Sequence, residues 1–328
     1  GGVVGISMAI GPILGGALVS IFDWRAIFWI NLPIGLTALV LTMRFVPESR
    51  APRPRRLDPV GQLLVIVLLG SVTFGIIEGG KEGWGSPILL WSFAVAVLAL
   101  GGLLRYEPRR DEPLLEMRFF RSVPFSGAFG IAVLAFAGLG GFLFLNTIYL
   151  QNDRHLSPFE AGLYLLPMAA VTLFASPLSG YLVGHFNARV PLLPAGVAIL
   201  ASGLLLTRLE PDSSLGLLFT AYALFGVGFG LVNAPITNTA VTGMPRTRAG
   251  VAASIASTGR QVGSALGVAV VGTTLANGSR TAGWWVIAGC GALVLLLGLL
   301  TTGRRARATA ERAMASFAAE PTAGEQRR

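Results

Sequence analysis

Ten mostly apolar runs of similar length follow one another along the 328-residue chain, with short polar connections between them. A bilayer has a hydrocarbon core about 30 Å thick, which a helix crosses with roughly 20 apolar residues. The pattern therefore predicts an all-α integral membrane protein, a polytopic bundle of about ten transmembrane helices. The predicted spans are residues 1–21, 27–46, 59–78, 87–105, 124–150, 161–182, 190–207, 215–239, 250–276 and 283–302.

Charged side chains are too few for a water-soluble exterior. They make up 12% of the chain, against 53% hydrophobic residues, whereas ordinary soluble domains have about 25% charged residues. The mean hydropathy of +0.69 points the same way. The single cysteine, Cys290, excludes a disulfide framework and a thiolate metal site, and we expect no metal to be bound.

Basic residues are distributed unevenly between the two sets of connections. Of the 25 Lys and Arg residues, nineteen lie in alternate connections and the tail, and five lie in the opposite connections. Cytoplasmic loops of membrane proteins carry the excess of basic residues, so this asymmetry predicts a cytoplasmic C-terminus. The net charge of +9 does not indicate nucleic-acid binding, because the basic residues are not gathered on one domain.

Arg260 is the remaining basic residue, and it alone lies well within an apolar run. An ionisable group at membrane depth costs at least a few kcal/mol and is therefore a candidate for function. Its guanidinium either binds an anionic or carbonyl group, pairs with an acidic residue of a helix outside this chain, or reaches the cytoplasmic interface by snorkelling. The sequence leaves these alternatives open.

The first run carries small residues at helical spacing, in the pattern Ser7-x-x-x-Gly11-Pro12-x-x-Gly15-Gly16. Such spacing lets a neighbouring backbone approach one face of the helix, so helix packing alone would explain it. The proline removes a backbone donor and bends the helix. A second motif follows directly, and the residues that we single out in it are Trp24, Arg25, Asn31 and Pro33.

Together these two motifs resemble the fifth and sixth helices of major facilitator superfamily drug exporters, most closely the fourteen-helix drug:proton antiporters. The sequence departs from that family at Ser7, where a glycine is usual. The resemblance implies the major facilitator fold and a fragment truncated at its N-terminus, which begins at the fifth helix. The implied divisions are the end of the first six-helix bundle (1–46), cytoplasmic loops with two extra linking helices (47–123), the second six-helix bundle (124–302) and a cytoplasmic tail (303–328).

The turn at residues 180–189 resembles a degenerate copy of the family's cytoplasmic gating loop. Gly180, Leu182 and Arg189 match the family pattern, whereas other positions of the turn differ. The alternative interpretation is a short basic turn that obeys only the orientation rule.

Several polar side chains lie in helices that correspond to the cavity-lining helices of that family or close to their ends. An amide in a membrane helix either bonds to another helix or contacts a ligand, and the sequence does not decide between these roles. The substrate-pathway candidates are Asn146, Tyr149, Asn233, Asn238, Arg260 and Gln261.

The resemblance implies a secondary active transporter that exports drugs or other amphipathic small molecules in exchange for protons, by alternating access. It implies a monomer in the plasma membrane whose partners are the bilayer and the substrate, with no enzyme activity and no cofactor besides the proton gradient. The sequence has no Gly-Lys-Ser/Thr loop for ATP. Because the family's proton-coupling acid lies in an earlier helix, we expect this chain alone to be inactive. The alternatives are a non-transporting binding or sensing protein, a non-functional remnant, and a sugar or metabolite facilitator of the same fold.

Overall fold

The computed structural model describes residues 2–48, 58–82, 85–110, 117–242, 249–303, 306 and 308–313. Within these ranges the chain is helical and contains no strand, and all ten predicted spans lie in helices, although 27–46 and 161–182 are each divided between two; this confirms the all-α prediction. The helices are α1 (Gly2–Ile21), α2 (Ala26–Trp29), α3 (Asn31–Phe45), α4 (Pro59–Glu82), α5 (Pro87–Tyr106), α6 (Val123–Ile148), α7 (Pro158–Tyr164), α8 (Leu166–His185), α9 (Arg189–Leu206), α10 (Leu215–Val241), α11 (Ala249–Ala276) and α12 (Arg280–Thr301).

Eight helical segments among the described residues are long and apolar enough to cross a membrane. The apolar stretch of α1, Ile10–Ile21, is shorter than these eight segments and is not counted among them. The helix α11 is not among the eight, because Arg260, Gln261 and several hydroxyl residues lower its hydropathy. The eight segments are Ala26–Phe45, Pro59–Gly79, Pro87–Arg109, Val123–Asp153, Leu166–His185, Arg189–Leu206, Leu215–Val241 and Arg280–Thr301.

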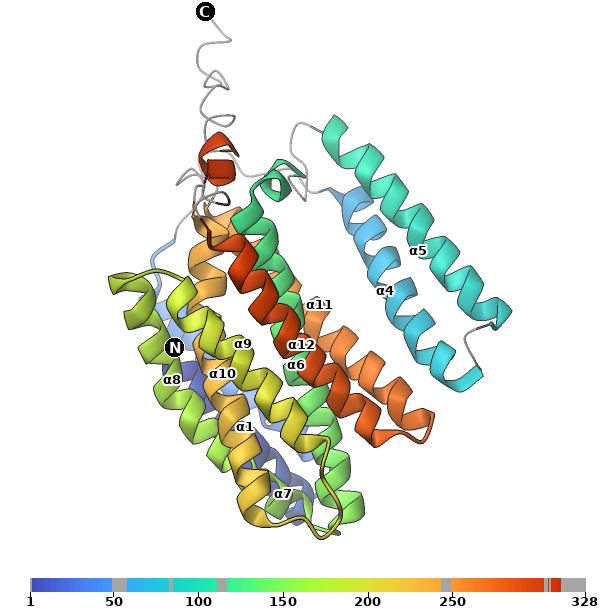
Figure 1. Cartoon of the computed structure of the whole chain (residues 1–328), viewed down its shortest axis with the longest axis vertical. Coiled ribbons are helices and arrows are strands. Elements are labelled where there is room, and N and C mark those ends of the chain that lie inside the picture. Colours follow the sequence, from blue (N-terminus) through green and yellow to red (C-terminus); the bar gives the residue numbers. More distant parts are fainter. Residues whose placement is uncertain are drawn as a thin grey trace, which may run out of the picture.

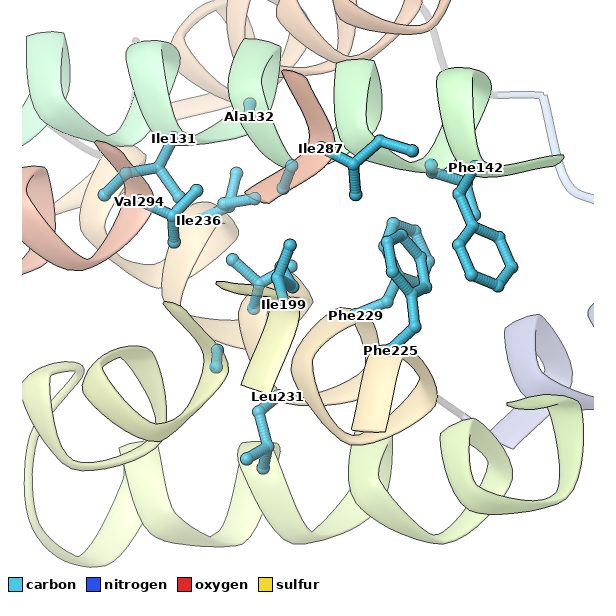
Figure 2. Packing of buried hydrophobic residues seen from close by; sticks show 14 of the residues in the cluster. Ile131, Ala132, Phe142, Ile199, Phe225, Phe229, Leu231, Ile236, Ile287 and Val294 are labelled. Atoms are coloured by element: carbon cyan, nitrogen blue, oxygen red, sulfur yellow. The ribbon is translucent and has the colours of Figure 1, made fainter. Parts of the chain in front are cut away.

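The helices α6 and α8–α12 form one bundle (Figure 1). Within it, α6 packs against α11 and α12, α10 packs against α8 and α9, and α9 packs against α12. Figure 2 shows the apolar side chains that fill the space between these helices. Among them Phe142 of α6 stacks on Phe225 of α10, with ring centroids 4.1 Å apart.

The outer surface of the bundle is also apolar. Phe174 of α8, and Trp91 and Leu98 of α5 beside the bundle, each expose more than 70% of their surface. Exposed apolar patches of this extent on a soluble monomer would cause aggregation, whereas lipid tails solvate them without cost. Both the packing and the surface therefore fit a bundle that is surrounded by lipid.

Two structural details depart from the predicted pattern of ten continuous helices. The predicted span at 161–182 is broken at Leu165, where α7 ends and α8 begins. The helix α7 starts with a capping box in which the Ser157 backbone N–H donates to the Glu160 carboxylate at 2.8 Å. This bond, with a second from the Ser157 hydroxyl, holds the pKa of Glu160 below its usual value.

The helix α6 continues past Ile148 into a π-helical turn, Tyr149–Asp153. The Arg154 N–H donates to the carbonyl of Tyr149, five residues earlier, at 3.1 Å. Such wide turns within α-helices are frequent at functional sites. Sequence periodicity gives no signal for this turn.

The helices α4 and α5 form a hairpin beside the bundle (Figure 1). The Thr273 hydroxyl of α11 donates to the carbonyl of Ile76 at 2.9 Å, which joins α4 to the bundle. At the other end of α4, buried Asp58 accepts from the Gly61 N–H at 3.0 Å and from the Tyr106 hydroxyl at 3.1 Å. Asp58 therefore caps α4 and ties it to the end of α5.

The predicted division into parts of two six-helix bundles with linking helices stays a prediction. Residues 49–57 and 314–328, which carry part of the predicted linking loop and most of the tail, lie outside the described residues.

Candidate transport pathway

The glycine-proline motif of α1 lies against α7, beside the main bundle (Figure 1). A methyl group built on Gly16 would lie 2.9 Å from the Cα atom of Phe159. Conversely, a methyl group built on Gly162 would lie 2.6 Å from the carbonyl oxygen of Pro12. The two glycines therefore allow the backbones of α1 and α7 to touch, as small residues do between membrane helices.

Gly11 and Gly15 of this motif do not take part in that contact. Ser7 and Gly11 are exposed. Among the described residues, nothing lies within 4 Å of a methyl group built on Gly11 or Gly15. The motif therefore has one face against α7 and another face that the described part of the chain leaves open.

A hollow of about 300 Å³ lies beside the contact between α1 and α7. The π-helical turn that follows α6 also borders it, and Thr147 and Gln151 provide polar side chains. The motif thus lines a space where helices from distant parts of the sequence meet. Its lining residues are Pro12, Gly15, Gly16, Val19, Ile27, Thr147, Leu150, Gln151, Pro158, Ala161, Gly162 and Leu165.

The second motif forms the connection from α1 to α3, and its singled-out residues are exposed. Arg25 forms an ion pair with Asp23 at 2.8 Å, and its guanidinium lies 4.6 Å from the centre of the Trp24 ring. Asn31 donates to the carbonyl of Ile27 at 3.1 Å. These contacts are local, and Pro33 likewise lies on the exposed face of α3.

Asn146 lies in the interior of the bundle and is fully buried. Its amide donates to the carbonyl of Phe142 at 2.9 Å, and its side-chain oxygen accepts from the Tyr222 hydroxyl of α10. Both bonds are internal to the bundle, and the second joins α6 to α10. Of the two roles open to this amide, the structure shows the interhelical bond.

Tyr149 is also fully buried. Its hydroxyl donates to the carbonyl of Glu210 at 2.8 Å and accepts from the Nε of Arg154 at 3.0 Å. Arg154 also donates to the carbonyl of Ser213. Together these bonds connect the end of α6 to the loop before α10.

A second link closes the same end of the bundle. Arg280, at the first position of α12, donates to the carboxylate of Asp153 at 2.9 Å, and the two side chains form an ion pair. Both side chains are at least half buried, which strengthens the attraction between their charges relative to a surface pair.

Arg260 donates to the hydroxyl of Thr237 at 2.7 Å, which links α11 to α10. Asn233 lies one turn from Thr237, is half buried, and donates to the carbonyl of Phe229 at 2.9 Å. Gln261 is exposed. The structure therefore brings Arg260 and Asn233 close together. Gln261, the next residue after Arg260, lies on an exposed face of α11.

Asn238 lies apart from that place, at the end of the bundle that carries the 180–189 turn. A hollow of about 340 Å³ there is lined by Asn187, Arg189 and Asn238, with Thr301 at the end of α12 and Thr302 after it. Arg189 is exposed and its N–H donates to the side chain of Asn187 at 2.9 Å. Gly180 is exposed and Leu182 is half buried.

The structure thus spreads the substrate-pathway candidates over four places instead of one cavity, and the roles of all the predicted site residues in transport stay predictions. Sequence reasoning missed Thr147, Gln151 and Tyr222. No motif marks these residues, and each acquires its position only through contacts between helices. In the described part of the chain, no group of three or more His, Cys, Asp or Glu residues could hold a metal ion.

Comparison with known proteins agrees with this architecture. Residues 1–268 match the Major Facilitator Superfamily. The multidrug resistance protein Stp of Mycobacterium tuberculosis is 40% identical over 277 residues, which cover 84% of this chain and 51% of Stp. The tetracenomycin C resistance and export protein of Streptomyces glaucescens is 38% identical over 278 residues, which cover 84% of this chain and 52% of that protein.

A third relative is the multidrug efflux pump LfrA of Mycolicibacterium smegmatis, 30% identical over 266 residues, which cover 81% of this chain and 52% of LfrA. The chain spans about half the length of the curated relatives it matches. The chain belongs to the Major Facilitator Superfamily, a family of transporters, as its two N-terminal motifs predicted. It is accordingly a multi-pass protein of the cell membrane, in contact with lipid.

Proposed function

We propose that the protein to which this chain belongs exports drugs or other amphipathic small molecules by secondary active transport. The observation that carries the proposal is the family match, together with 40% and 38% identity to proteins named for multidrug resistance and for export. In such transporters two bundles rock against each other around a site near the midplane.

Two features of the structure support this function. The motif that resembles the antiporter signature forms a backbone contact between α1 and α7 and borders a hollow of about 300 Å³. Among the described residues of the ten predicted spans, only Arg260 places a charge well away from the ends of its span, as suits a pathway for lipophilic compounds.

The proposal extends to energy source and orientation. The proton gradient drives export, no further cofactor is needed, and the protein catalyses no covalent reaction. It works as a monomer, with the C-terminus and the arginine-rich loops in the cytoplasm. Asn238 and Arg189 then lie at the cytoplasmic end, and the Asp153–Arg280 pair lies at the outer end.

A dye-efflux assay tests the proposal. An efflux-deficient bacterial host expressing the complete gene product is loaded with ethidium, and loss of fluorescence is followed after energisation. We expect faster efflux than in host cells without the gene, and we expect a protonophore to abolish the difference. The 328-residue chain expressed by itself is expected to give no efflux.

Three other outcomes would contradict the proposal, each in a different way. Ligand binding without flux would indicate a binding or sensing protein. Movement of sugars or metabolites down their gradient, insensitive to protonophore, would indicate a facilitator. Neither binding nor flux by the complete gene product would indicate a non-functional remnant.

A further inference from the structure

Arg260 lies deep in α11. It is eleven residues from Ala249, where the described helix begins, which corresponds to about 16 Å at 1.5 Å per residue. Arg260 is the twelfth of the 28 residues of α11, so its Cα atom lies near the middle of a helix long enough to cross a hydrocarbon core about 30 Å thick. Helical side chains lean toward the N-terminus of their helix, so the guanidinium points toward the arginine-rich end of the bundle.

The guanidinium has only a neutral polar partner within the described ranges. Its Nη2 donates to the Thr237 hydroxyl at 2.7 Å, and its Cζ lies 5.8 Å from the centre of the Phe136 ring. Its Nε is buried and has no hydrogen-bond acceptor among the described residues. No described carboxylate forms an ion pair with it.

Aromatic rings and polar side chains both lie close to Arg260. Phe136 of α6 packs edge-on against Phe229 of α10, with centroids 5.1 Å apart. On the open side, Ser257 and Gln261 of α11 are exposed, and Thr237 of α10 is exposed as well. We call Arg260, Thr237, Gln261 and Phe136 the Arg260 cluster.

A cation at membrane depth without a counter-charge is costly, by at least a few kcal/mol. A guanidinium is best satisfied by a planar anionic oxygen pair, to which it donates two parallel hydrogen bonds. It also stacks on flat aromatic systems. A planar compound that carries a carboxylate or an ionised phenol would meet all of these requirements at once.

We propose that the Arg260 cluster binds the acidic oxygens of planar aromatic substrates, so that the transporter accepts organic anions. The inference rests on the proposed export function, whose substrate class it specifies. The guanidinium holds the anionic group, Thr237 fixes the guanidinium from the side of α10, and the ring of Phe136 forms an apolar floor beneath the substrate.

Two dyes that share one ring system test the proposal. Fluorescein is anionic and rhodamine 123 is cationic, and both are planar xanthenes. Binding of each dye to the purified complete transporter is measured by fluorescence anisotropy, and export of each is measured in cells. We expect Arg260→Gln to lower the ratio of fluorescein affinity to rhodamine affinity by about tenfold, the typical worth of a charged hydrogen bond.

A second variant tests the same expected change in affinity ratio without removing the arginine. Thr237→Asp places a carboxylate beside the guanidinium and should lower the same affinity ratio by a similar factor. Arg208→Gln is the control, because Arg208 is an exposed arginine outside the cluster, and it should leave the ratio unchanged.

Equal losses of both dyes in Arg260→Gln would overturn the proposal and would indicate that Arg260 pairs with a carboxylate of the protein itself. An unchanged ratio in both cluster variants would overturn it as well. If the unaltered protein binds fluorescein through Arg260 but exports neither dye, the proposed export function is wrong and the proposed anion site is supported. If both dyes are exported but the ratio does not depend on Arg260, the anion site fails while export stands.

Discussion

Replacing Gly267 by alanine is expected to destabilise the protein, although alanine is the better helix former. A methyl group at this position would lie 2.6 Å from the Cα atom of Ala137, in the tightly packed seam between α11 and α6. Gly263, one turn earlier, approaches α6 in the same way, 2.9 Å from the Cα atom of Val133. Because the colliding atoms belong to the backbone, no side-chain rotation relieves the contact.

The two opposing effects of this substitution can be compared. Alanine gains about 1 kcal/mol over glycine in a helix interior. Overpacking costs typically about 1–3 kcal/mol and more where the neighbour is rigid. We therefore expect a net loss of about 2 kcal/mol, seen as a lower midpoint in thermal unfolding of the purified protein.

Gly272→Ala is the matched control in the same helix. The nearest atom to a methyl group there is an edge carbon of Phe144 at 3.7 Å, which is ordinary contact distance. This variant should unfold at the original temperature or slightly above it. If Gly267→Ala were as stable as Gly272→Ala, the close packing of α11 on α6 would be wrong.

Replacing Gly16 by alanine is expected to impair export more than it impairs folding. The added methyl group would press on the start of α7 at Pro158 and Phe159, where the backbones of the α1 motif and α7 touch. The contact lies at the edge of the bundle, so the helices can separate without unfolding its core. A shift of about 1.4 kcal/mol between transport states changes a rate about tenfold, and we expect the initial efflux rate to fall by that factor.

The comparison with Gly15→Ala makes this prediction specific. Gly15 is the adjacent residue of the same motif, and a methyl group built there meets no described atom within 4 Å. It should therefore keep most of the efflux rate. Equal rates for the two variants would show that the contact between α1 and α7 has no part in transport.

The helices could be predicted from sequence because each apolar run is long enough to span a bilayer and is bounded by polar residues. In lipid the backbone must satisfy its own hydrogen bonds, which leaves few alternatives to a helix. The break at Leu165 and the π-helical turn at Tyr149–Asp153 escaped prediction. Both are local adjustments of backbone bonding that leave the apolar pattern unchanged.

The candidate site was less predictable, because its geometry depends on contacts between distant segments. Asn146 meets Tyr222 across 76 positions of sequence, and Arg260 meets Thr237 across 23. The sequence identified Arg260 as the one charge well within an apolar run, and Asn146 as an amide in a helix that corresponds to a cavity-lining helix of the family. Their partners are a tyrosine and a threonine, which are unremarkable in a membrane helix until the helices are assembled.

Labelling of cysteines from outside intact cells tests most directly whether this is a membrane bundle with its arginine-rich ends in the cytoplasm. The native Cys290 is buried and is replaced by serine. Single cysteines are then placed at Asp212 and at Glu311, which are both exposed and lie at opposite ends of the bundle. An impermeant maleimide should label Asp212→Cys and should label Glu311→Cys only after the cells are opened. Labelling of Glu311→Cys in intact cells, with Asp212→Cys protected, would contradict the proposed orientation.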